Sequence, residues 1–201
     1  MKFKILEKSR EMFLSCGFKS VTMDDISEEL GISKKTIYAH YQNKTKLVEA
    51  TTLAFFESIS NGINCICELN KNPIEELYAI KSYVMKHLKD EKSSPQHQLQ
   101  KYYPKLFFTL KKKQLVLIQE CITENLRKGI EQKLFRNEID VNFISLIYFN
   151  GITGIKDEET FPRNKFTASY LLENYLEYHI RAIATEKGLK TLQNLLSKNE
   201  N

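Results

Sequence analysis

Apolar residues recur every three or four positions along almost the whole chain, a spacing that places them on one face of an α-helix. The first such segment runs from about Lys2 to Cys16, and Gly17 follows at a position where helices often end. No segment shows the alternation of apolar and polar residues that marks a strand. The hydrophobic pattern therefore predicts an all-α fold.

Several helix starts share one signal, in which an apolar residue precedes a capping side chain and a second apolar residue follows a turn later. Thr22 is such a cap, and Ser33 is the next, directly after a turn at Gly31. Asn72-Pro73 and Asp140 give further starts. After the first helix, the signals predict helices over about residues 23–30, 34–41 and 44–69, from residues 73 and 95 onward, and over 104–133, 140–155, 165–184 and 189–196, with polar loops at 89–94, 134–139 and 156–164.

Composition supports helices, because only 7 Gly and 4 Pro occur among 201 residues. The net charge of +5 permits an anionic partner without demanding one. No apolar run approaches the roughly 18 residues needed to cross a bilayer. We therefore expect a soluble, cytoplasmic protein with no membrane contact.

The stretch from Gly31 to Val48 carries hydroxyls, lysines and aromatic residues but neither Asp nor Glu. Two helices around a glycine turn occur in many proteins, but a helix that is merely solvated normally mixes in acidic residues. The first turn of the helix over 34–41 holds Ser33, Lys34, Lys35 and Thr36. Backbone N–H groups at a helix start favour phosphate, and Tyr38 and His40 lie one turn further on, on the same faces. This surface predicts DNA binding through phosphates and base edges.

Five short motifs stand in order along residues 5–56: Gly17-Phe18, Thr22 to Ile26, Leu30 to Ser33, Thr36 to Tyr41 and Asn43-Lys44. They resemble the N-terminal domain of TetR-family transcriptional regulators. The resemblance implies that the third helix enters the major groove and that Thr22 and Lys44 contact phosphates. It implies a DNA-binding set of Thr22, Ser33, Lys34, Lys35, Thr36, Tyr38, His40 and Lys44. Ala39 stands where an aromatic residue is commoner, which leaves the operator preference open.

The resemblance also implies a domain plan. Residues 1–50 would form a three-helix helix-turn-helix domain, and a long helix would join it to a larger helical ligand-binding and dimerisation domain over residues 51–201. The helices near 140–155 and 165–184 would form a homodimer interface, although their apolar residues could equally fill the monomer core. The expected protein is a homodimeric repressor that binds a palindromic double-stranded DNA operator.

Aromatic residues are frequent in the second half of the plan, where they are ordinarily core residues but could also line an apolar cavity. For a small, largely apolar effector the sequence suggests Tyr102, Tyr103, Phe107, Phe108, Phe149 and Asn150. The alternative is a DNA-binding adaptor or nucleoid-type protein without an effector, and a cavity in the body would separate the two.

No motif for catalysis, a metal or a cofactor stands out. The four histidines lack partners at metal spacing, and phosphate-binding loops and nucleophile elbows are missing. We therefore expect no enzyme, no catalytic residues and no cofactor. Cys16, Cys65, Cys67 and Cys121 follow no redox spacing, and Cys65 and Cys67 face different sides of a helix. They are interpreted as small apolar residues, with a thiol sensor as the minor alternative.

Overall fold

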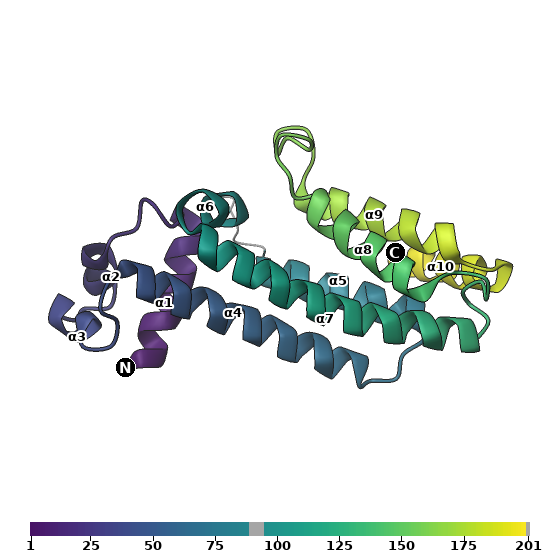
Figure 1. Ribbon diagram of the computed structural model, residues 1–201, viewed down its shortest axis with the longest axis horizontal. Coiled ribbons are helices and arrows are strands. Elements are labelled where there is room, and N and C mark those ends of the chain that lie inside the picture. Colours follow the sequence, from purple (N-terminus) through teal and green to yellow (C-terminus); the bar gives the residue numbers. More distant parts are fainter. Residues whose placement is uncertain (89–94, 200–201) are drawn as a thin grey trace. The chain divides into compact units, whose positions relative to one another are not determined.

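The computed structural model describes residues 1–88 and 95–199, and it confirms the all-α fold. The helices in the described part of the chain are α1 (Lys2–Cys16), α2 (Met23–Glu29), α3 (Lys34–Tyr38), α4 (Lys44–Cys67), α5 (Pro73–Leu88), α6 (Pro95–Tyr102), α7 (Pro104–Glu131), α8 (Val141–Gly154), α9 (Ala168–Ile183) and α10 (Glu186–Asn199) (Figure 1). Phe135 and Ala184 form an isolated β-bridge. The loop expected at residues 89–94 lies outside the described residues.

Most predicted helix starts are present, but three helices have a bound that lies about three residues from the prediction. α3 ends at Tyr38 rather than Tyr41, because the N–H groups of His40 and Tyr41 both bond to the Ile37 carbonyl in a tight turn. α9 begins at Ala168, since Thr167 Oγ1 accepts a hydrogen bond from the Tyr170 N–H. α10 is longer than expected at both ends.

The chain divides into two compact units, one of Met1–Asn61 with His87–Gln114 and one of Gly62–Lys86 with Leu115–Asn201. These units are defined by packing alone. The functional division predicted at residue 50 stays a prediction. Helix α4 is continuous from Lys44 to Cys67, so it contributes residues to both units.

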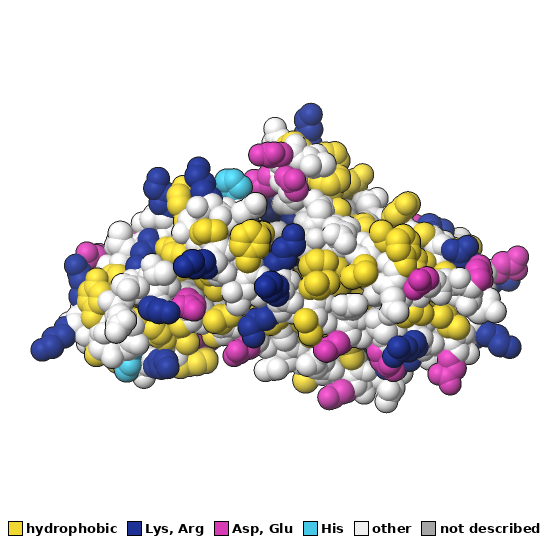
Figure 2. Space-filling view, in the orientation of Figure 1, with side chains coloured by type: hydrophobic (Ala, Val, Ile, Leu, Met, Phe, Trp, Pro, Cys, Tyr) yellow, Lys and Arg dark blue, Asp and Glu magenta, His cyan; other side chains and the backbone are white. Residues whose placement is uncertain are grey.

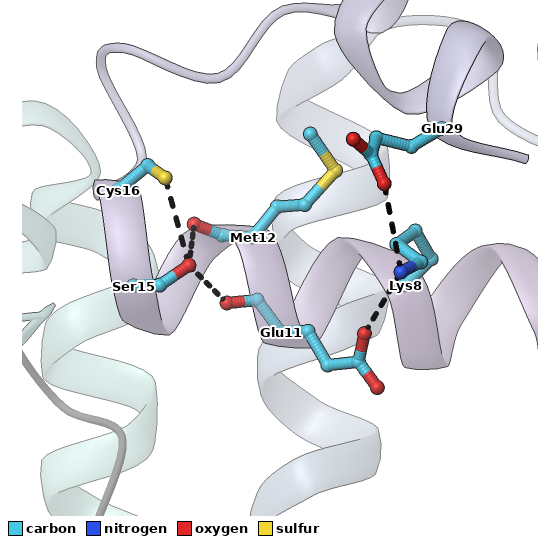
Figure 3. Close-up of polar contacts among 6 residues, drawn as sticks. All are labelled: Lys8, Glu11, Met12, Ser15, Cys16 and Glu29. Carbon is cyan, nitrogen blue, oxygen red and sulfur yellow. Dashed lines mark hydrogen bonds and ion pairs between the residues drawn. The ribbon is translucent and has the colours of Figure 1, made fainter.

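The first unit is built on one apolar core. Its most deeply buried side chains are Ile5, Phe13, Ile26, Ile37, Leu47 and Val48. Helix α1 packs on α2, and Lys8 reinforces this contact. The Lys8 Nζ lies 3.1 Å from Glu11 Oε2 and 3.7 Å from Glu29 Oε2 of α2 (Figure 3). Helices α2 and α3 are too short to be stable alone, so packing on the first core stabilises them.

The second unit has its own core, in which the most deeply buried side chains are Ile74, Leu126, Phe135, Leu176, Ile180, Ile183 and Leu192. Helices α8 and α9 lie side by side in it (Figure 1). Gly188 of α10 is required by close packing, because a Cβ there would collide with the Leu134 carbonyl oxygen. Within residues 1–88 and 95–199, no helix is both long and apolar enough to cross a membrane.

Candidate nucleic-acid interface

Caps at the starts of α2 and α3, and a glycine between the two helices, fix the backbone of this segment. Thr22 Oγ1 accepts from the Asp25 N–H at 3.1 Å, and the Asp25 Oδ2 accepts from the Thr22 N–H at 2.8 Å. This bonding lowers the pKa of Asp25. Gly31 has a φ of 60°, a left-handed conformation that glycine adopts at low steric cost. Ser33 then caps α3 by accepting from the Thr36 N–H at 3.2 Å.

Helix α3 has one buried and one exposed side. Ile37 is fully buried in the first core, whereas the Tyr38 side chain is 47 % exposed. Ser33, Lys34, Lys35 and His40 are also exposed, and Thr36 is half-buried with its hydroxyl 2.9 Å from that of Ser33. On the face shown in Figure 2, Lys and Arg side chains outnumber acidic ones over α1 to α3. This arrangement offers a cationic, aromatic surface at a helix start.

Two of the lysines in this segment have acidic neighbours. Lys34 Nζ lies 2.5 Å from Asp24 Oδ1 of α2, and Lys46 Nζ lies 2.7 Å from Glu49 Oε2 of α4. The stretch from 31 to 48 is free of acids in sequence, but Asp24 of α2 and Glu49, the residue directly after the stretch, pair with two of its lysines. A phosphate that binds Lys34 therefore competes with Asp24.

Lys44 differs from the other predicted contacts because it is half-buried. Its Nζ donates to the Lys19 carbonyl oxygen at 3.2 Å, which ties the start of α4 to the segment before α2. Burial lowers the pKa of Lys44, and the charge of Asp25 opposes that shift. Lys44 thus stabilises the first unit whether or not it meets a phosphate.

The structure places the suggested effector residues in different units. Tyr103 and Phe107 pack against the first core, and Tyr102 and Phe108 are 40 % and 60 % exposed. Phe149 is buried in the second unit, where the exposed Asn150 donates to the Leu146 carbonyl. A hollow of about 340 Å³ on α7 is lined by other residues: Val116, Gln119, Glu120, Thr123, Glu124 and Arg127. The effector set stays a prediction.

Sequence reasoning missed a group of buried polar side chains in the second unit. Asn125 Nδ2 donates to Glu76 Oε1 at 2.7 Å and to the Pro73 carbonyl at 2.9 Å. His179 is buried against the rings of Tyr148 and Tyr175, and burial lowers its pKa to about 4. The signal was present for Asn125, since it interrupts the apolar stripe formed by Ile122 and Leu126. Among the described residues, no group of three His, Cys, Asp or Glu side chains is placed to hold a metal ion.

Helices α8 and α9 each leave an apolar stripe uncovered in the single chain. Phe143, Leu146 and Ile147 of α8 are 59 %, 41 % and 46 % exposed, at the spacing of one helix face. Tyr170 and Tyr178 of α9 are 55 % and 72 % exposed. Hydrophobic side chains are visible at the surface over α8 (Figure 2). The residues expected to fill either a core or an interface thus fall into two groups. Phe143, Leu146 and Ile147 are exposed, whereas Tyr148, Leu176, Ile180 and Ile183 lie in the core.

Comparison with known proteins shows what this chain is similar to. Residues 5–51 match the model described as "Bacterial regulatory proteins, tetR family". The uncharacterised HTH-type transcriptional regulator YvaF of Bacillus subtilis is 26 % identical over 195 residues, which cover 93 % of this chain and 97 % of YvaF. The HTH-type transcriptional repressor KstR2 of Mycobacterium tuberculosis is 22 % identical, with coverages of 91 % and 92 %. A TetR-family regulator from Agrobacterium tumefaciens shares the fold, with a TM-score of 0.72 at 17 % identity and coverages of 92 % and 97 %.

Proposed function

The chain belongs to the TetR family and is a DNA-binding transcriptional regulator, and from that premise we propose that it is a ligand-responsive repressor that binds a palindromic operator as a homodimer. The family is one of regulators rather than enzymes. One observation carries the proposal for DNA: α3 presents Tyr38 and its lysines outward while Ile37 anchors it in the core.

On this proposal, α3 lies in the major groove with Lys34 and Lys35 near phosphates and Tyr38 and His40 near base edges. The Ser33 cap supports that role, because the helix start also directs backbone N–H groups outward. Thr22, Thr36 and Lys44 flank this surface and complete the proposed contact set. Phosphate contacts fix the register, and groove contacts supply the sequence preference.

The test is a binding titration at several salt concentrations on a duplex selected from a random pool. Lys35→Ala should lower affinity and reduce the slope of log affinity against log salt by about one. Lys190→Ala is the matched control, since it removes another exposed lysine, from α10, and should change neither quantity. Equal slopes for wild type and Lys35→Ala would remove Lys35 from the interface.

For dimerisation, the proposal assigns the exposed stripes of α8 and α9. Both helices carry exposed apolar and aromatic side chains at helical spacing, while their opposite faces are already buried in the second core. Large exposed apolar side chains that line one surface mark an interaction site rather than a solvated one. A second copy that brings the same stripes would bury them symmetrically around a two-fold axis.

For the effector, the second core offers polar anchors inside an apolar surrounding. Glu76 Oε2, Tyr78 OH, Asn125 Oδ1 and His179 Nε2 are buried and find no hydrogen-bond partner within the described residues. Unpaired polar groups in a core are rare, because each loses its hydration without compensation. A small apolar molecule with one or two polar groups would satisfy such atoms, and it would favour the arrangement of helices that admits it.

A compound screen tests this part. Apolar and aromatic compounds with one or two polar groups should include binders that lower operator affinity, and Asn125→Leu should weaken their binding more than it weakens DNA binding. Tight binders that leave operator affinity unchanged would show that ligand binding and DNA binding are not coupled, since a ligand with equal affinity for both conformations of the protein does not shift their populations. A failure to find any binder would favour the adaptor alternative.

A further inference from the structure

Two cysteines that are far apart in sequence meet in the second unit. Cys67 is the last residue of α4, and Cys121 lies in the middle of α7. Their Sγ atoms are 3.4 Å apart. A disulfide bond is about 2.05 Å long, so the two sulfurs need to approach by little more than one ångström. Sequence reasoning compared only Cys65 with Cys67 and therefore missed this pair.

Cys67 and Cys121 are less exposed than the other two cysteines. Cys67 and Cys121 are half-buried, whereas Cys16 and Cys65 are exposed. A hydrogen bond with Cys121 lowers the pKa of Cys67. The same bond raises the pKa of Cys121, and the charge of Glu76 adds to that rise while Lys128 opposes it. One member of the pair is thus biased to be the nucleophilic thiolate and the other to stay protonated.

We propose that Cys67 and Cys121 are a modification site, a dithiol that a hydroperoxide oxidises to a disulfide between α4 and α7. The Cys67 thiolate attacks the distal oxygen of the hydroperoxide, and the O–O bond breaks. This step leaves a sulfenic acid on Cys67 and an alkoxide or hydroxide that takes a proton from water. The Cys121 sulfur then attacks the Cys67 sulfur, the S–O bond breaks, and hydroxide leaves as water with the Cys121 proton. Two electrons pass from the two thiols to the hydroperoxide.

The second step becomes easier once the first has occurred. The pKa of Cys121 is raised first by its hydrogen bond to Cys67, next by burial and then by the charge on Cys67, and a neutral sulfenic acid removes that charge. The disulfide then holds the C-terminal end of α4, the helix whose first turn carries Lys44. Fixing α4 to α7 at this point restricts the rearrangements that this helix can make. Oxidised and reduced forms should therefore differ in operator affinity, which rests on the proposed DNA-binding function.

The chemical test uses the full chain with Cys16→Ser and Cys65→Ser, which leaves only the proposed pair. Thiol titration in denaturant should find two thiols in the reduced protein, none after hydrogen peroxide, and two again after dithiothreitol. Peptide mass spectrometry should find residues 67 and 121 linked within one chain. Persistent thiols, a loss that dithiothreitol does not reverse, or links between chains would overturn the proposal.

Stability and DNA binding give two further readouts. Closing a loop between residues 54 positions apart should raise the melting temperature of the oxidised form by roughly 5–10 °C, and Cys121→Ser should abolish this shift. Operator affinity should change at least several-fold on oxidation in the same background and stay constant in Cys121→Ser. Equal affinity of both redox forms would overturn the regulatory role, whereas no DNA binding by the reduced protein would instead overturn the proposed function.

Discussion

Lys34 reaches from α3 back to α2, where its Nζ lies 2.5 Å from Asp24 Oδ1. Both side chains are largely exposed, so the pair contributes little to the stability of the free protein. The pair is important because Asp24 and a DNA phosphate would compete for the same ammonium group of Lys34. Asp24 of α2 therefore reduces the positive charge of the proposed DNA-binding surface.

Replacing Asp24 tests this competition. Asp24→Asn keeps the shape of the side chain and frees Lys34, so DNA affinity should rise several-fold, to a similar extent for operator and unrelated sequences. Fluorescence anisotropy with two duplexes measures both affinities. Glu159→Gln is a suitable control, since it removes an exposed carboxylate from the loop before α9. An affinity that falls or stays constant in Asp24→Asn would mean that Lys34 does not meet phosphate.

Tyr38 and Ile37 are adjacent on α3 but face opposite sides, which separates recognition from stability. Tyr38→Ala should weaken operator binding by on the order of 1–3 kcal/mol and leave the melting temperature almost unchanged. Ile37→Ala, in contrast, should lower the free energy of unfolding by roughly 2–5 kcal/mol because it opens a cavity in the first core. A marked loss of stability in Tyr38→Ala with unchanged operator preference would place Tyr38 in the core instead.

Lys44 is expected to combine both effects. Lys44→Ala should weaken binding to all sequences about equally and reduce the salt slope by about one. It should also lower the melting temperature, because the Lys19 carbonyl loses its donor. Comparing salt slopes at a temperature well below unfolding separates the two effects, and an unchanged slope would make Lys44 a purely structural residue.

The sequence was sufficient for the helical fold and for the helix starts around α3 because both depend on local signals, whereas the DNA-contact residues stay a prediction. Caps such as Thr22, Ser33 and Asp140 act within one turn of themselves, and each is present in the structure as predicted. The ion pair of Asp24 with Lys34 and the contact of Cys67 with Cys121 depend on packing between helices. Spacing along one helix contains no information about such pairs. The same holds for His179, whose isolation in sequence concealed its burial against two tyrosines.

We expect His179 to make the stability of the second unit depend on pH. Burial lowers its pKa to about 4 in the folded chain, below the ordinary value of 6.5. Between these values the unfolded chain binds the extra proton and the folded chain does not. Stability is therefore complete above about pH 6.5 and falls as the pH drops toward 4, by up to about 3 kcal/mol.

Denaturant unfolding at several pH values measures this dependence. His179→Leu removes the titrating group, so its stability should vary much less between pH 6.5 and 4 than that of the wild type. His40→Gln removes an exposed histidine and should keep the wild-type dependence. If His179→Leu retains the full acid sensitivity, the buried imidazole is not its source.

The α8 and α9 stripes give the last prediction, which concerns the dimer. Ile147→Glu places a charge in the middle of the proposed interface, where burial without a partner is strongly unfavourable. Light scattering should find the wild type as a dimer and Ile147→Glu as a monomer with an unchanged helical spectrum. Val116→Glu is the matched control, because Val116 is an apolar residue of α7 with 55 % exposure, and this variant should remain a dimer.

Loss of the dimer should also weaken operator binding far more than any single contact does. A dimer carries two α3 helices. Once the first is bound to the operator, the second binds at a high effective concentration, provided that the two helices lie roughly 34–36 Å apart or a multiple of that distance. A monomer keeps the contacts of one α3 helix but loses the affinity that the second helix adds. Ile147→Glu should therefore bind a single half-site as well as the wild type does and lose its preference for the full palindrome. A variant that is monomeric yet still prefers the palindrome would show that α8 and α9 do not set the spacing of the two α3 helices.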